Sequence, residues 1–291
     1  TMKIENTLSF IIILLFSCNI YSYNSNNNCE KLMQEGNNLD AVTAAMKIKD
    51  QYDKHFCLGK AYYRSNKHDL AVKAFATSEG LAKLPVDQMF SMLYKGIAER
   101  DLGKFDLSNK TFTKGLETAK LGNTKYLQME RRFLYQLGQN HLAKEDYLEA
   151  IDFFAKSTVV SANDNERAEG YDGLAMAYSG KKKSTKAIEY GLKAANMYRK
   201  VGAYNEYADA QIKLSSYHLQ DNAPDRALDV LERLERFAID NGSRYYEAKA
   251  LLEQSLVFKH KNDEQSALTK FNTGIDIANE IGANDLLPAA K

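Results

Sequence analysis

The chain of 291 residues has no tryptophan, only three prolines and almost no net charge, with 39 lysines and arginines against 38 aspartates and glutamates. This near balance gives no bulk electrostatic attraction to nucleic acid or to an acidic membrane surface. Because proline interrupts helices, its scarcity beside many alanines, leucines, lysines and glutamates favours a helical protein. The length suits two average domains or one array of repeats.

The sequence patterns of common catalytic and metal sites are also missing. No HExxH, GxSxG, CxxC or Walker pattern occurs, and the five histidines are scattered without the spacing of metal ligands. The segment SGKKKS at 179–184 lacks the glycine spacing of a phosphate-binding loop. We therefore expect no catalytic residues, no cofactor and no metal, and a protein that is not an enzyme.

The N-terminal apolar run, Leu8 to Ile20, is shorter than the roughly 20 residues that span a bilayer as a helix. Lys3 precedes it and small residues follow it, which is the layout of a secretory signal. Cleavage after Ser22 would give a soluble exported protein, for which we expect the bacterial periplasm. Alternatively, LFSC resembles a lipobox and Cys18 carries a lipid that anchors the protein to the membrane. A third interpretation is an uncleaved anchor or a buried helix.

Two cysteines, Cys29 and Cys57, remain after such a cleavage. An oxidising compartment permits a disulfide between them, and the alternative is two unpaired thiols. Residues 23–29 are predicted to form a disordered leader, and residues 30–51 an N-terminal helical cap or degenerate repeat. A bridge would tie this cap to the helix that follows it.

Small residues recur in pairs that are always twelve positions apart. The six pairs are Gly59/Ala71, Gly96/Ser108, Gly138/Ala150, Ala175/Ala187, Ser215/Ala227 and Ser255/Ala267. Two antiparallel helices joined by a short turn approach to about 8–10 Å only where neither carries a bulky side chain. Larger residues lie four positions after the second small residue, as in Phe75, Phe112 and Phe154. Each pair therefore indicates one helical hairpin that buries its remaining apolar face against the next.

This pattern, Leu-Gly, an aromatic residue three later, Ala twelve after the Gly and Phe four beyond that, resembles the tetratricopeptide repeat (TPR). On that frame, six repeats cover residues 52–281. They start at Tyr52, Met89, Arg131, Ala168, Ala208 and Ala248. Their spacing exceeds the usual 34 residues, which is similar to exported TPR proteins of long period. The resemblance implies an all-α solenoid of about six antiparallel helix pairs that form a right-handed superhelix.

Residues 282–291 are predicted to start a further helix that the chain does not finish, which indicates a truncated fragment. Glycines 122, 202, 242 and 282 are predicted to end the second helices of their repeats in the left-handed conformation.

The resemblance also implies a concave groove lined by the first helix of each repeat. At the groove positions, basic and aromatic side chains suit a peptide that carries carboxylates. The candidate peptide-binding residues are Lys60, Tyr63, Arg64, Arg100, Arg132, Tyr135 and Gln139. For each of them, the competing interpretation is a solvated helix face.

We therefore expect an exported scaffold that binds a protein or a peptide, such as an acidic or carboxylate-bearing one, and no nucleic acid. Contact with a membrane is expected only through a lipid on Cys18 or through a segment beyond Lys291. The alternative is the periplasmic sensory region of a larger signal-transduction protein, a diguanylate cyclase or histidine kinase, whose output domain lies outside this chain.

Overall fold

The structure, a computed structural model, describes residues 28–288, and within this range it contains helices and turns but no strand. None of the helices in this range combines the length and the apolar character that crossing a membrane requires. The expected signal segment, its cleavage site and Cys18 lie outside the described residues.

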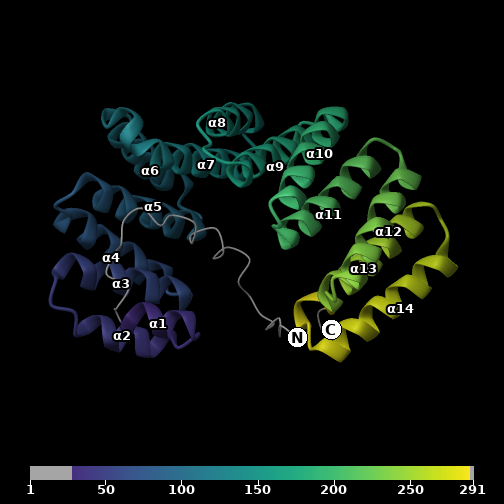
Figure 1. The fold of residues 1–291 in the computed structure, drawn as a ribbon, viewed down its shortest axis with the longest axis horizontal. Helices are drawn as coiled ribbons and strands as arrows, with labels where there is room; N and C mark the ends of the chain where they lie inside the picture. The colour runs from purple at the N-terminus through teal and green to yellow at the C-terminus, as the bar shows by residue number, and fades with distance from the viewer. Residues whose placement is uncertain (1–27, 289–291) are drawn as a thin grey trace. The chain divides into compact units, whose positions relative to one another are not determined.

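The described helices are consecutive packed pairs, and they group into two compact units whose boundary falls after Gly173, inside α9 (Figure 1). The N-terminal unit holds the helices α1 (Asn28–Gln34), α2 (Asn38–Met46), α3 (Gln51–Arg64), α4 (His68–Leu81), α5 (Pro85–Asp101), α6 (Phe105–Leu121), η2 (Asn123–Tyr126), α7 (Leu127–Ala143), α8 (Tyr147–Val159) and the first part of α9 (Asp164–Gly180).

The C-terminal unit holds the rest of α9 and the helices α10 (Ser184–Lys200), α11 (Tyr204–Gln220), α12 (Pro224–Asp240), α13 (Arg244–His260), α14 (Glu264–Ile281) and η3 (Asn284–Leu286). The residues after Gly282 were predicted to open an α-helix; as far as Pro288, the last described residue, they form the 3-10 turn η3. Leu286 and Leu287 of this segment pack against Leu251 and Ile277.

The predicted all-α solenoid of about six helix pairs is confirmed, with the pairs running from α3/α4 to α13/α14. Most of these helices are 17 residues long, so a pair with its links needs more than the usual 34 residues. Before them, α1 and α2 form a shorter pair of 7 and 9 residues that packs on α3. Helix α1 begins at Asn28, inside the stretch predicted as leader.

The structure explains why a glycine twelve residues before a small residue is combined with a phenylalanine four residues after it. In the first three repeats the phenylalanine ring lies directly on the glycine of the same hairpin. A Cβ atom added at Gly59 would lie 2.5 Å from the ring of Phe75, and one at Gly96 would lie 2.4 Å from Phe112. Both rings are fully buried. The glycine therefore makes room for the largest core side chain of its repeat.

Three of the four predicted glycine caps adopt a positive φ: 75° at Gly202, 70° at Gly242 and 69° at Gly282. The prediction for Gly122 is wrong, because its φ is −84°. The next residue, Asn123, takes the positive φ of 50° instead and opens η2. An asparagine tolerates this conformation better than most residues with a side chain.

Successive repeats are also linked by ion pairs between residues one repeat apart. Near the hairpin turns, Lys104 contacts Asp69 at 3.2 Å and Lys144 contacts Asp106 at 2.8 Å. In the C-terminal unit, Lys261 contacts Asp225 at 2.6 Å. Exposed pairs of this kind contribute little stability, typically about 0–1 kcal/mol. These ion pairs bring together opposite charges that lie about one repeat apart in the sequence.

Candidate functional site

The candidate peptide-binding residues lie on the first helix of each of the first three repeats. These are Lys60, Tyr63 and Arg64 on α3, Arg100 on α5, and Arg132, Tyr135 and Gln139 on α7. We call this set the N-terminal surface. The structure shows that most of its members already have partners within the chain, which changes what each can offer to a ligand.

The two candidate cations on α3 both contact residues of α1. Lys60 forms an ion pair with Glu30, and an Arg64 guanidinium N–H donates to the main-chain carbonyl of Met33. Lys60 is only 16% exposed at its side chain, and this burial lowers its pKa although Glu30 opposes the shift. The short pair α1/α2 therefore uses these cations to dock on α3, and a ligand would have to compete with Glu30 and Met33 for them.

Two further candidates bind polar groups of neighbouring helices. The Tyr63 hydroxyl donates to the carboxylate of Asp101 at 2.6 Å, and burial raises the pKa of this tyrosine. The Arg100 guanidinium donates to Gln136 Oε1 at 2.6 Å, and burial lowers its pKa. These bonds hold α3, α5 and α7 in register and leave each side chain with fixed geometry.

Tyr135 and Gln139 form a pair within α7. The amide Nε2 of Gln139 donates to the Tyr135 hydroxyl at 2.8 Å, and the Tyr135 ring packs on Phe154 with centroids 5.5 Å apart. Burial raises the pKa of Tyr135, and the carboxylates of Glu169 and Asp172 raise it further. The hydroxyl is thus neutral and can still donate a hydrogen bond.

Arg132 differs from the other three cations of the set, because it has no hydrogen bond or ion pair within the described residues. Its side chain is half-buried on α7. Its charge acts on Tyr94, a tyrosine of α5 that the sequence analysis missed. Burial raises the pKa of Tyr94 to about 12, and the charges of Arg132 and Arg64 oppose this rise. A half-buried guanidinium without an ion pair can still bind a carboxylate or another anion.

Acidic groups interleave with these cations, so the surface is not uniformly basic. The sequence analysis did not include four carboxylates that each raise the pKa of a nearby tyrosine. Asp101 acts on Tyr63, Glu30 acts on Tyr94, and Glu169 and Asp172 act on Tyr135. Asp172 and Glu169 of α9 are buried, with 8% and 4% exposure. The pKa of Glu169 is raised by burial, while Arg131 and Arg132 act against this shift.

Three buried charged residues of this unit form a cluster that the sequence analysis also missed. Arg131 donates to Glu169 at 2.8 Å, and its Nε lies 3.7 Å from Glu166. The side chains are only 8%, 5% and 11% exposed. The signal that could have found the cluster is the same one-repeat separation of opposite charges that links Asp106 to Lys144.

A disulfide joins Cys29 of α1 to Cys57 of α3, with the Cα atoms 6.6 Å apart. This is the pairing considered from the sequence. Both residues are buried, with 0% and 2% exposure, and they pack beside Met33 and Leu58. The bridge therefore holds α1 next to Lys60 and Arg64, the two cations that α1 contacts.

Elsewhere in residues 28–288, no group of three or more His, Cys, Asp or Glu side chains is arranged to hold a metal ion. Within the described residues, the N-terminal surface combines a guanidinium without an ion pair, two tyrosine hydroxyls and a glutamine amide, all of which can form hydrogen bonds with a ligand.

No family model matches the sequence, and no curated protein matches it. Solved structures do resemble it. The STAND signal-transduction ATPase of Pyrococcus horikoshii, which has a tetratricopeptide repeat sensor, matches with a TM-score of 0.71 at 16% identity. The match covers 89% of this chain and 42% of that protein, so this chain spans less than half its length.

Two Rap proteins are also similar. The apo form of RapI has a TM-score of 0.62 at 13% identity, over 80% of this chain and 99% of RapI. The Rap conjugation gene regulator of plasmid pLS20, solved in complex with the Phr* peptide, has a TM-score of 0.53 at 16% identity, over 90% of this chain and 75% of that protein. At this identity the similarity establishes the fold. The chain therefore shares the all-α solenoid fold of the tetratricopeptide-repeat proteins.

Proposed function

We propose that the protein is a non-enzymatic scaffold that binds a peptide, or an extended segment of another protein, through the N-terminal surface. The observation that carries this proposal is the half-buried guanidinium of Arg132, which has no hydrogen bond or ion pair within the described residues. Support comes from the Rap regulator of similar fold that was solved with a bound peptide. A repeat array exposes an extended surface of the kind that suits an extended ligand.

The ligand would place a carboxylate on Arg132, because a guanidinium offers two parallel N–H donors that match a carboxylate. Next to it, the Tyr135 hydroxyl and the Gln139 amide form a neutral polar strip. The carboxylates of Glu169 and Asp172 raise the pKa of Tyr135, so their negative charge acts on this strip. A strongly acidic ligand would be repelled there, so we propose a ligand with a single carboxylate followed by neutral or basic groups.

Replacing Arg132 with glutamine should lower the affinity for such a ligand at least tenfold, since a hydrogen bond to a charged group contributes about 1.5–3 kcal/mol. An immobilised array of decapeptides, each with one carboxylate at a varied position, provides the probe. The matched control is Lys110→Gln, which removes the same charge from an exposed residue of α6. The proposal is wrong if the Arg132 variant retains the binding pattern of the unmodified protein. It is also wrong if no peptide of the array binds to the unmodified protein.

We also propose that the protein is exported and processed near Tyr23. The disulfide supports this, because structural disulfides persist in oxidising compartments and are rare in the cytosol. Mass spectrometry of the protein from its host should find an N-terminus near Tyr23. A lipid on Cys18 would favour the lipoprotein instead, and an intact N-terminus would exclude both forms of processing.

A second candidate function is the sensory region of a larger signalling protein. The observation that favours it is the similarity to a STAND protein in which the tetratricopeptide repeats are described as a sensor. The two candidates differ in what the gene encodes after Lys291. A transmembrane segment of about 20 apolar residues followed by an output domain would favour the sensor, and a stop codon would favour the scaffold.

A further inference from the structure

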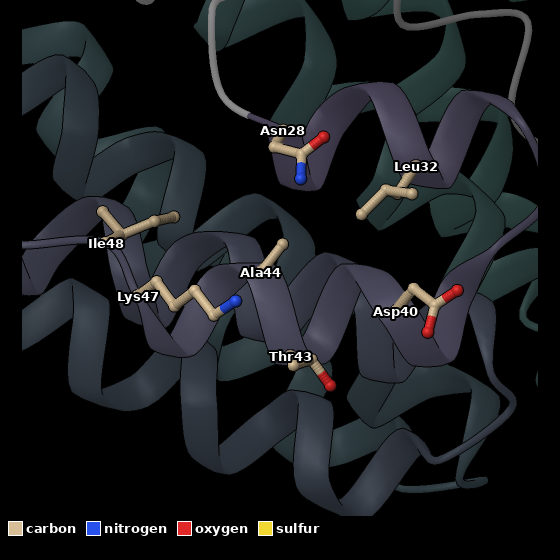
Figure 2. A pocket seen from close by; sticks show the side chains of 7 residues that line it. All are labelled: Asn28, Leu32, Asp40, Thr43, Ala44, Lys47 and Ile48. Atoms are coloured by element: carbon tan, nitrogen blue, oxygen red, sulfur yellow. The ribbon is translucent and has the colours of Figure 1, made fainter.

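A crevice of about 510 Å³ lies between α1 and α2, at the N-terminal end of the helix stack. It is lined by Asn28, Leu32, Asp40, Thr43, Ala44, Lys47 and Ile48. Figure 2 shows Asn28 and Leu32 of α1 facing the row of side chains that α2 presents. This row is a strip along one helix face, with the two charged groups at its ends. The polar groups therefore do not converge on one point, as they would in a pocket for a small molecule.

Two large apolar side chains of α2 are exposed at this end of the repeat array. Leu39 is 69% exposed and Met46 is 55% exposed, and their spacing places both on one side of the helix, at the edge of the strip. Terminal repeats of a solenoid normally present a polar outer face, because no further repeat covers them. At the other end of the described chain, Leu286 and Leu287 cover the last helix pair. The apolar face of α2 lacks such a cover within the described residues.

The charges on this face have a two-fold symmetry in sequence. Asp40 lies three residues before Thr43, and Lys47 lies three residues after Ala44. An antiparallel copy of α2, related by an axis between Thr43 and Ala44, would therefore place Asp40 of each copy against Lys47 of the other. Leu39 and Met46 share one edge of this strip, so the same axis brings Leu39 of one copy near Met46 of the other. Neither Asp40 nor Lys47 forms an ion pair within the described chain.

From this arrangement we propose that two copies of the protein associate through the α2 face in an antiparallel, two-fold dimer. The centre of the contact consists of Thr43 and Ala44, which are small enough for two helices to approach closely. The surface is self-complementary, as an interface with two-fold symmetry requires. Exposed apolar side chains at its edges gain from burial against the second copy.

The dimer is expected to be weak. Stable interfaces bury about 1,200–2,000 Å² in total, and a contact made by one nine-residue helix with its flanks lies below this range. Association in the micromolar range is therefore expected rather than the nanomolar affinity of larger interfaces. The disulfide ties α1, which forms the other wall of the crevice, to α3.

Sedimentation equilibrium of the purified chain over micromolar to millimolar concentrations tests the proposal. The unmodified protein should show a monomer–dimer equilibrium. Asp40→Lys and Lys47→Asp, each alone, place like charges together twice in the dimer and should lower the association constant at least tenfold. The double variant Asp40→Lys/Lys47→Asp restores both pairs with reversed sign, so its association constant should return to within about threefold of the original.

The control is Asp276→Lys, which makes the same charge change at an exposed position of α14 and should leave association unchanged. A monomer at all concentrations would overturn the proposal, and would mean that the residues before Asn28 or a different protein covers this face. Dimers that resist both single reversals would also overturn it. So would a loss of association that the double variant does not repair, because only the antiparallel two-fold contact predicts that rescue. None of these outcomes depends on peptide binding by the N-terminal surface.

Discussion

Replacing Arg131 with methionine should lower the free energy of unfolding by about 3–5 kcal/mol at neutral pH, which is the usual cost of removing one partner from a buried ion pair. Arg131 is the cation of the cluster that includes Glu169 and Glu166. Methionine fills much of the same space without charge. The loss in the free energy of unfolding therefore reports the cost of leaving the Glu169 carboxylate buried without its partner. Urea unfolding at pH 7, followed by circular dichroism, provides the measurement.

The effect should depend on pH in a definite direction. Burial already raises the pKa of Glu169 above its ordinary value, and Arg131 opposes this rise. Without Arg131 the pKa rises further, so the folded variant binds a proton at a pH where the unfolded chain, with a glutamate pKa of about 4.3, does not. Protonation favours the folded variant as the pH falls. The difference from the unmodified protein should therefore be largest at pH 7 and shrink toward pH 5.

Two further variants separate the buried charge from other effects. Arg132→Met removes the neighbouring, half-buried cation that has no ion pair, and should change stability by no more than about 0.5 kcal/mol. Arg131→Met combined with Glu169→Gln removes the closest pair of charges and leaves Glu166, so it should recover part of the loss, because neutral replacements of a buried ion pair are often tolerated. An equal loss in the Arg131 and Arg132 variants would contradict the role of the buried cluster.

The fold could be predicted from the sequence because its determinants recur. A glycine such as Gly96 and a phenylalanine such as Phe112 occupy fixed offsets that follow from close helix approach, and six occurrences outweigh local departures. The predicted cap at Gly122 failed for a local reason, since the chain turns one residue later at Asn123. A single position has no repetition to support it, so boundaries are less predictable than the array.

The candidate site was less predictable, because its properties depend on partners one repeat away. The sequence places Lys60, Arg64 and Arg132 at groove positions of their repeats. The structure shows that α1 engages the first two, whereas Arg132 has no ion pair or hydrogen bond within the described residues. Arg131 was treated as the start of a repeat, although its partner Glu169 lies 38 residues later. Periodicity gives the face on which a side chain lies, but not the group that it meets there.

Removing the disulfide by the double substitution Cys29→Ala and Cys57→Ala should release α1 and α2 from the rest of the N-terminal unit. The bridge joins residues 28 positions apart, and closing a loop of this length stabilises the folded state by roughly 3–4 kcal/mol in the chain-entropy model. Helices of 7 and 9 residues are too short to persist alone in water. The loss is therefore expected to be local, with the later repeats still folded.

Amide hydrogen exchange measures this local loss. In the double variant, the amides of residues 28–48 should exchange about a hundredfold faster, since 3 kcal/mol corresponds to roughly that factor. Exchange in α7 and α8 should not change, which separates local release from global unfolding. Treating the unmodified protein with a dithiol should reproduce the pattern.

Release of α1 would also free Lys60 from Glu30 and Arg64 from Met33, so the N-terminal surface would gain two available cations. If residues 28–48 keep their protection without the bridge, packing around Met33 and Leu58 holds the cap, and the disulfide is not what decides the state of this surface.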